Sequence, residues 1–185
     1  MSIDGTVPDR TAKQEYDRAR YLRLKAEREA TKDPDPISQL AETDIAYLAG
    51  LTDADGSIYV THTNRLRTYY PTVLWAMTHR ETIDWVQAAV GGGAVQLHNH
   101  TNLRRGTTSW GSSNFREQWR TQVAGARAQL LCHRMHPYMR TKAVQASLVV
   151  EFPVDARTAP GVHLPEEIRL RRVQLAEQIS ALNRR

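Results

Sequence analysis

Apolar and polar residues repeat along this chain with the periods of helices and strands in turn. Residues 44–54, 80–90, 126–135, 138–152 and 166–185 repeat apolar side chains every three to four positions, which predicts helices. Residues 57–63, 68–78, 94–100 and 117–125 alternate apolar and polar side chains, which predicts strands. This order predicts an α+β fold, with a four-stranded antiparallel sheet that has helices on one face and an open second face.

Residues 1–42 have a different pattern from the rest of the chain. Residues 10–32 are almost entirely polar and rich in arginine and lysine, with only a thin stripe of large apolar side chains. The two prolines of the following DPDPIS segment interrupt any helix. We therefore expect a basic helical arm and a linker over residues 1–42, or a disordered tail, and one globular domain over residues 43–185.

The alternation within the strands divides their side chains between two faces of the sheet. One face is apolar, with Ile58, Val73, Trp75 and Val123 directed at the helices. Hydroxyl, amide, imidazole and guanidinium groups of the other face suit base edges in a DNA major groove, although a solvated sheet face has a similar composition. This face comprises Ser57, Tyr59, Thr61, Thr63, Thr68, Tyr70, Thr72, Gln96, His98, His100, Gln118, Arg120 and Gln122. Loop residues Arg65, Arg67, Arg104 and Arg105 are candidates for phosphate contacts.

Composition narrows the possible partners. The 185 residues carry a net charge of +5, which favours a polyanion, and two copies would double it. The single cysteine, Cys132, provides neither a disulfide nor a thiolate zinc site. A membrane span needs about eighteen consecutive apolar residues, which the sequence lacks, and residues 1–10 have no apolar signal region. We expect a cytoplasmic, intracellular protein without a membrane partner.

Residues 46–60, AYLAGLTDADGSIYV, place two carboxylates where the first helix of the domain ends and the first strand begins. An EF-hand calcium loop with Gly56 at its sixth position would need acidic residues in place of Leu51 and His62, so that interpretation fails. Helical spacing gives this helix a face of small residues, with Tyr47, Leu48 and Leu51 directed at the core. The small-residue face includes Ala46, Ala49, Gly50 and Asp53.

The small-residue face predicts a homodimer. Small side chains let a second backbone approach closely, and the sequence holds no second copy of the pattern that could serve as an internal partner. The simplest partner is therefore the same helix of a second subunit. A twofold axis would bring two Asp55 carboxylates together, where cations relieve their repulsion, and magnesium (Mg²⁺) suits oxygen ligands of this kind.

The segment LAGLTDADG resembles the LAGLIDADG signature of homing endonucleases, from which it differs only at Thr52. The segments VGGGAVQLH, WRTQVAG, MHPYMRTKAVQASL and EQISALN are also similar, so the resemblance spans roughly residues 43–183 in the order of that family's αββαββα fold with its saddle-shaped sheet. It implies a magnesium-dependent, site-specific endonuclease that cuts double-stranded DNA as a homodimer on a long, near-palindromic duplex. The family also includes DNA-binding regulators that do not cleave and intron-RNA maturases, and both remain alternatives.

The resemblance also implies roles for the residues of the signature. Asp55 corresponds to the metal-binding catalytic acid, and the carbonyl of Ala54 to a second metal contact. Asp53 is expected to support the helix end at the dimer interface.

Two residues outside the signature complete the implied site. His79, at the end of the second strand, would order water or carry a proton, and Lys142 would stabilise charge at the scissile phosphate. The sequence departs from the family near Ile83, where an arginine is expected. Arg80 and Arg140 are candidates to replace that arginine.

Overall fold

The computed structural model describes residues 10–30, 33–63, 68–98, 117–154 and 164–184, which form parts of two compact units. The first unit contains α1 (Arg10–Ala30), the helix predicted for the basic arm. The second unit begins at Asp35 and holds the remaining described helices and strands. None of the described helices has both the length and the apolar character needed to cross a bilayer.

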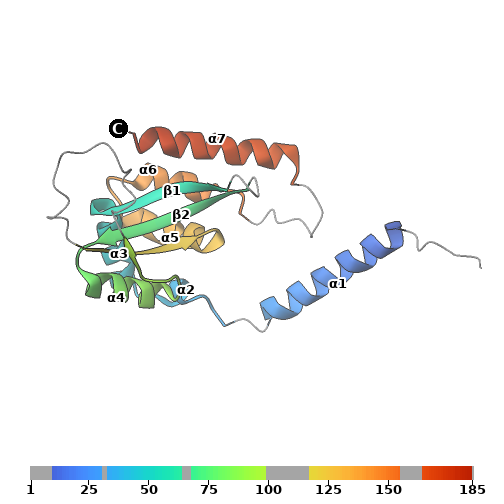
Figure 1. The fold of residues 1–185 in the computed structure, drawn as a ribbon, viewed down its shortest axis with the longest axis horizontal. Coiled ribbons are helices and arrows are strands. Elements are labelled where there is room, and N and C mark those ends of the chain that lie inside the picture. The colour runs from blue at the N-terminus through green and yellow to red at the C-terminus, as the bar shows by residue number, and fades with distance from the viewer. Residues whose placement is uncertain (1–9, 31–32, 64–67, 99–116, 155–163, 185) are drawn as a thin grey trace, which may run out of the picture. The chain divides into compact units, whose positions relative to one another are not determined.

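The second unit has the predicted α+β architecture (Figure 1). Its strands form one antiparallel sheet in the order β1-β2-β4-β3. The helices that form its core alternate with strand pairs as the sequence predicts, which confirms the fold class. The elements are α2 (Pro36–Gln39), α3 (Glu42–Ala54), β1 (Gly56–Thr63), β2 (Thr68–Met77), α4 (Arg80–Val90), β3 (Gln96–His98), β4 (Gln118–Ala124), α5 (Ala126–Met135), the 3₁₀ turn η3 (His136–Tyr138), α6 (Ala143–Val150) and α7 (Glu166–Leu182).

The strand register confirms the predicted division of the sheet into two faces. Ile58 lies opposite Val73, and Trp75 lies opposite Thr121, and all four side chains are buried against the helices. Figure 1 shows α3, α5 and α6 on one side of the sheet, where they supply the other half of the core. The apolar strand positions therefore fix which face remains for polar contacts.

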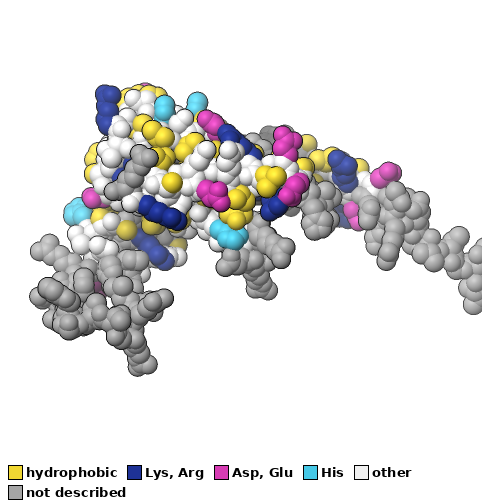
Figure 2. Space-filling model, turned by 90° about the horizontal axis from the view of Figure 1, so that it is seen from above, with side chains coloured by type: hydrophobic (Ala, Val, Ile, Leu, Met, Phe, Trp, Pro, Cys, Tyr) yellow, Lys and Arg dark blue, Asp and Glu magenta, His cyan; other side chains and the backbone are white. Residues whose placement is uncertain are grey.

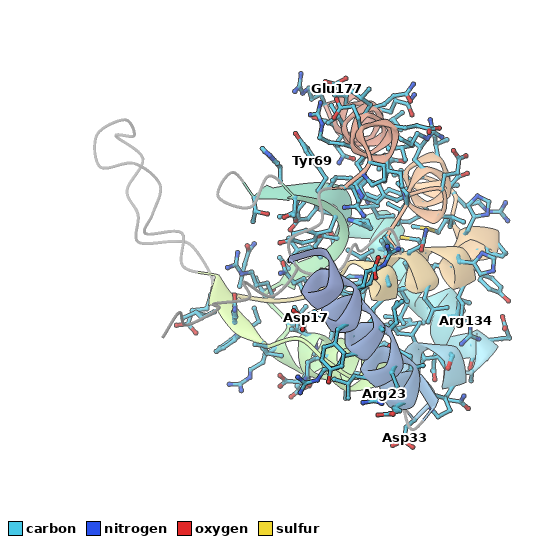
Figure 3. The ribbon with its side chains drawn as sticks, turned by 90° about the vertical axis from the view of Figure 1, so that its right-hand side faces the viewer. Asp17, Arg23, Asp33, Tyr69, Arg134 and Glu177 are labelled. Carbon is cyan, nitrogen blue, oxygen red and sulfur yellow. The ribbon has the colours of Figure 1, made fainter. Side chains whose placement is uncertain are left out.

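The segment that precedes α3 is not the linker that the sequence predicts. Asp35 caps α2 by accepting the backbone N–H of Ile37 at 3.0 Å, and Ile37 is completely buried. Arg127 of α5 donates to both carboxylate oxygens of Asp35, at 2.6 and 3.1 Å, and also to the carbonyl of Val90. Arg134, labelled on α5 in Figure 3, donates to the carbonyls of Ile37 and Leu40 at 2.6 and 2.9 Å. Two prolines thus begin an anchored turn, and the globular unit starts eight residues earlier than expected.

Glycine ends α4 for a conformational reason. Gly91 caps the helix in the left-handed region with φ of 64°, which glycine adopts without a Cβ clash. A Cβ at this position would also lie 2.3 Å from the ring of Pro36. The close approach of α2 to the end of α4 therefore depends on this glycine.

The predicted helix over residues 138–152 is shorter in the structure. Residues 136–138 form a 3₁₀ turn, and α6 begins only at Ala143. The backbone N–H groups of Arg140, Thr141 and Lys142 donate to the carboxylate of Asp53. The approach of α3 therefore sets the start of α6, which the periodicity of residues 138–152 does not reveal.

Thr52, the position at which the chain departs from the LAGLIDADG signature, has a specific partner in the core. Its hydroxyl donates to the carbonyl of Leu48 at 2.6 Å and accepts the indole N–H of Trp75 at 2.9 Å. Both side chains are fully buried. An isoleucine at residue 52 would leave the indole donor of Trp75 buried without this acceptor, at a cost of about 1–3 kcal/mol.

We predict that Thr52→Val lowers the free energy of unfolding by about 1–3 kcal/mol, because it removes the acceptor and keeps the side-chain volume. Thr52→Ser keeps the hydroxyl and serves as the matched control. Denaturant unfolding of the two variants, each also combined with Trp75→Phe, measures the coupling. An equal cost of Thr52→Val with and without the indole would contradict the assigned hydrogen bond.

Candidate active site

The acidic end of α3 is held in a tight connection to β1. Asp55 caps the helix, and its backbone N–H donates to the carbonyl of Leu51 at 3.0 Å. Gly56 begins β1 immediately afterwards, and a Cβ there would lie 2.7 Å from the Cα of Thr52. Only glycine allows the strand to leave the helix this closely, so the glycine of the motif fixes where the Asp55 carboxylate emerges.

Asp53 and Asp55 occupy different environments although they stand two residues apart. The carboxylate of Asp53 accepts the backbone N–H groups of Arg140, Thr141 and Lys142 at 2.5, 3.1 and 2.9 Å. Asp55 is exposed, and no donor among the described residues binds its carboxylate. Asp53 therefore has a structural role, as predicted, and Asp55 remains available to a ligand.

The protonation of Asp53 reflects these contacts. Partial burial on its own raises the pKa of the Asp53 carboxyl. The backbone N–H donors of Arg140, Lys142 and Thr141, together with the charge of Lys142, outweigh burial, so this pKa lies below its ordinary value. Asp53 is thus ionised at neutral pH and acts as the N-terminal cap that α6 lacks within its own sequence.

Lys142 completes a reciprocal contact between α3 and the start of α6. Its ammonium group donates to the carbonyls of Thr52 and Asp53 at 2.8 and 2.7 Å. These are the last carbonyls of α3, where a positive charge is also favoured by the helix dipole. The structure therefore places the Lys142 ammonium at the C-terminal end of α3, where its charge is engaged mainly with the helix end. One of its three N–H donors remains for a ligand.

His79 lies at the same end of the sheet and caps α4. Gly56 pairs with Trp75, so β1 begins and β2 ends at this edge, which brings His79 and Asp55 to one end of the sheet. The backbone N–H of Thr82 donates to Nδ1 of His79 at 3.3 Å, and Nε2 lies 3.5 Å from a carboxylate oxygen of Glu81. The sequence analysis does not predict this capping role. Capping alone explains a histidine at the start of α4 and requires no catalytic role for it.

Arg80 and Arg140, the candidates to replace the missing arginine, differ in their contacts. Ile83 is completely buried, so its side chain belongs to the core. Arg80 stacks over the ring of Trp119 at 4.4 Å and pairs with Asp84 at 3.3 Å. The side chain of Arg140 is exposed, which leaves it as the better placed of the two to reach a bound phosphate.

The exposed face of α3 differs in part from the predicted one. Gly50 is exposed, Ala46 is half-buried, and a Cβ added at Gly50 would meet nothing within 4 Å. Ala49 was expected on this face, but it is completely buried because it follows Ile45 by one helical turn. Tyr47 was expected in the core, but it is 51% exposed and packs edge-on against Trp85 of α4, with ring centroids 5.1 Å apart.

The polar face of the sheet carries its side chains as predicted, but many of them bind each other. The hydroxyls of Thr61 and Thr72 lie 2.8 Å apart, and Thr63 bonds to Thr68 across the strands. Arg120 donates to the amide oxygen of Gln96 at 3.1 and 3.3 Å. Thr72 has no exposed surface, so it supports the face rather than contacting a ligand. Of the other members of this face, Ser57 and Gln122 are exposed, and Tyr59, Tyr70 and Gln118 are half-buried.

Several predicted contact residues cannot be placed. Arg65, Arg67, His100, Arg104 and Arg105 lie outside the described residues, and the side chain of His98 is also outside them. The loop arginines therefore remain predictions from sequence.

The described residues contain no cluster of three or more His, Cys, Asp or Glu side chains that would hold a metal ion alone. At the end of α3 one chain offers the Asp55 carboxylate and the Ala54 carbonyl, and both residues are exposed. Such a sparse oxygen donor set fits magnesium, which keeps several waters and binds through one or two carboxylates plus phosphate.

Comparison with solved structures identifies the fold. The homing endonuclease I-CvuI, solved with an I-CreI DNA target in the presence of magnesium and not cleaving it, matches with a TM-score of 0.57 and 21% identity over 76% of this chain and 82% of that chain. The archaeal intron-encoded homing endonuclease I-Vdi141I complexed with DNA gives 0.54 and 16%, over 76% and 84%. The LAGLIDADG meganuclease I-AabMI bound to uncleaved DNA gives 0.51 and 12%, over 71% of this chain and 43% of that chain.

No family model and no curated protein matches the sequence. The structural likeness nevertheless shows that the second unit has the fold of the LAGLIDADG homing endonucleases. The match covers most of the length of I-CvuI and less than half of the length of I-AabMI.

We predict that Asp53→Asn lowers the free energy of unfolding by about 1.5–3 kcal/mol at neutral pH, because it removes a charged acceptor from three N–H donors. Asp55→Asn is the matched control, and its exposed carboxylate predicts a change within about 0.5 kcal/mol.

The pH dependence of this difference follows from the lowered pKa of Asp53. The carboxylate contributes fully above the unfolded-state pKa of about 3.9, and its contribution is lost as pH falls through the lower folded-state pKa. Unfolding curves of the parent and Asp53→Asn should therefore converge in acid. A difference that stays constant from neutral pH into this acidic range would show that the carboxylate charge is not involved.

Proposed function

We propose that this protein is a homodimeric, magnesium-dependent endonuclease that cuts double-stranded DNA at a specific, near-palindromic site. The observation that carries the proposal is the end of α3, where the neighbouring Asp53 is fully engaged and Asp55 is exposed without a partner among the described residues. A carboxylate with no structural role, fixed by a rigid helix end, has the properties of a catalytic metal ligand. The fold shared with DNA-bound homing endonucleases supports the same proposal.

In the proposed site, the Asp55 carboxylate and the Ala54 carbonyl would hold magnesium together with water and a DNA phosphate. Bound there, magnesium would supply an activated water and neutralise charge on the phosphate. The remaining N–H donor of Lys142 would face the same phosphate, and Arg140 would add a second positive charge. A water-ordering role for His79 would have to use Nε2, because Nδ1 is bound in the helix cap.

The proposed dimer explains why the site is incomplete in one chain. Pairing of two α3 helices across Gly50 would bring two Asp55 carboxylates together, one for each DNA strand. The exposed aromatic pair of Tyr47 and Trp85 lies next to this face and would be covered by the second subunit. The polar sheet faces of both subunits would then follow one long duplex, with Ser57, Tyr59 and Gln122 among the residues that reach base edges.

Selection from a library of long randomised duplexes with magnesium tests the activity. We expect the parent to cut one near-palindromic sequence, and Asp55→Asn to bind that sequence but cut it at least about 100-fold more slowly. Equal cleavage by Asp55→Asn would refute the proposed site. Binding by the parent without cleavage would instead indicate a DNA-binding regulator, and a requirement for intron RNA would indicate a maturase.

Two variants of His79 separate its possible roles in the same assay. Asparagine is a good helix cap, so His79→Asn keeps the start of α4, whereas His79→Ala loses it. Full activity of His79→Asn would restrict the residue to capping.

We predict that Gly50→Leu leaves the fold intact and abolishes the dimer. A Cβ added here meets nothing within 4 Å, and replacing glycine inside a helix stabilises the helix by roughly 0.5–1 kcal/mol. The same side chain would keep the two α3 helices apart. Sedimentation at a concentration where the parent is dimeric checks the prediction, with Ala181→Leu on the exposed side of α7 as control. Dimeric Gly50→Leu would exclude this face as the interface.

A further inference from the structure

The charges of α1 are segregated around the helix. At 3.6 residues per turn, six of its seven arginine and lysine positions fall within one half of the circumference, together with a single acidic residue, Asp17. We call these six positions the basic face of α1. The other half holds three of the four glutamate and aspartate positions and four alanines, with Arg23 as its single basic residue. The basic face comprises Arg10, Lys13, Arg18, Arg20, Lys25 and Arg28.

Two of the basic-face residues, Arg18 and Arg20, have described side chains, and these are not neutralised by carboxylates of the described residues. Arg23 of the opposite face pairs with Glu27 at 3.8 Å, and Arg23 is labelled on this helix in Figure 3. Arg18 and Arg20 are exposed, and neither has a carboxylate partner among the described residues. The basic face therefore presents positive charge that solvent or a polyanion must balance.

The last helix of the chain provides the contrast. In α7, Arg169 pairs with Glu166, and Arg171 pairs with Glu151 at 2.7 Å. Figure 2, which looks onto the side of the molecule where α7 lies, shows acidic and basic side chains intermixed. A helix rich in arginine therefore need not have an anion-binding face. What distinguishes α1 from α7 is that its basic and acidic residues lie on opposite sides of the helix.

We propose that the basic face of α1 binds the phosphate backbone of the DNA outside the segment that the sheet reads. This inference rests on the proposed function, because it needs a duplex held by the second unit. Arginine and lysine contact phosphate without regard to sequence, and the hydroxyl of Tyr21, which lies on the same face, is a further phosphate donor. Residues 31–34 alone separate α1 from the second unit, so a duplex held by that unit meets α1 at high effective concentration.

The composition of α1 favours DNA over a lipid surface or a second helix. Helices that lie on membranes place large apolar side chains opposite their basic residues. The half opposite the basic face holds Tyr16 and Leu22 but otherwise mainly alanine and glutamate, which would repel an anionic bilayer. The alanines leave little apolar area for a stable helix pair.

Salt titration of the full chain tests the inference, with the duplex obtained by selection and extended by ten or more base pairs at each end. Each lost phosphate contact lowers the slope of log affinity against log salt by about 0.9, so Arg18→Gln combined with Arg20→Gln should lower it by about 1.8 per chain. Glutamine has a helix propensity close to that of arginine. Arg23→Gln, on the opposite face, is the matched control and should leave the slope unchanged.

Trimming the duplex to the selected core should abolish the difference between the parent and the double variant. An unchanged slope for the double variant on the extended duplex overturns this inference and leaves the proposed function intact. A parent that binds no duplex overturns both. The parent and the double variant could instead differ only in RNA binding or only in their dimerisation constant. Either result would assign α1 to a different partner and would also overturn the inference.

Discussion

The position of the candidate active site depends on one reciprocal contact between α3 and the start of α6. The Asp53 carboxylate binds three backbone N–H groups of residues 140–142, and the Lys142 ammonium binds the carbonyls of Thr52 and Asp53 in the last turn of α3. Each half satisfies backbone groups that a helix end leaves unpaired. Because the two halves use opposite charges at opposite helix ends, they also agree with both helix dipoles. Asp55 is thereby fixed without being bound.

This contact gives Asp53 and Asp55 different roles, although both are aspartates at the same helix end. Removal of the charge of Asp53 is expected to lower the stability of the fold, whereas removal of the charge of Asp55 is expected to change only what the exposed helix end can bind. Lys142 has both roles in the proposed function, since its charge holds the end of α3 and would also face the bound phosphate. A loss of activity at Lys142 therefore does not identify a catalytic group unless the position of α3 is measured as well. Stability and activity separate cleanly only at the two aspartates.

Much of the fold could be predicted from the sequence because its signals are local. The alternation in residues 57–63 and the three-to-four spacing in residues 80–90 each depend on one element, and the structure agrees with both. The errors occur where the packing of one element on another decides. Tyr47 is exposed and packs against Trp85 of α4, and Ala49 is buried one helical turn after Ile45. The cap of α6 comes from a residue that precedes it by about ninety positions, which no local pattern contains.

The departure at Thr52 shows how a fold persists when a signature changes. Isoleucine and threonine are both β-branched, but the hydroxyl of Thr52 needs partners in the core, and the chain provides them in Leu48 and Trp75. The indole of Trp75, in turn, is acceptable in the centre of the sheet only because Thr52 accepts its N–H. Two substitutions that would each be costly alone are therefore compatible together. Compatible pairs of this kind are one way in which a chain with 21% identity to I-CvuI can keep the same fold.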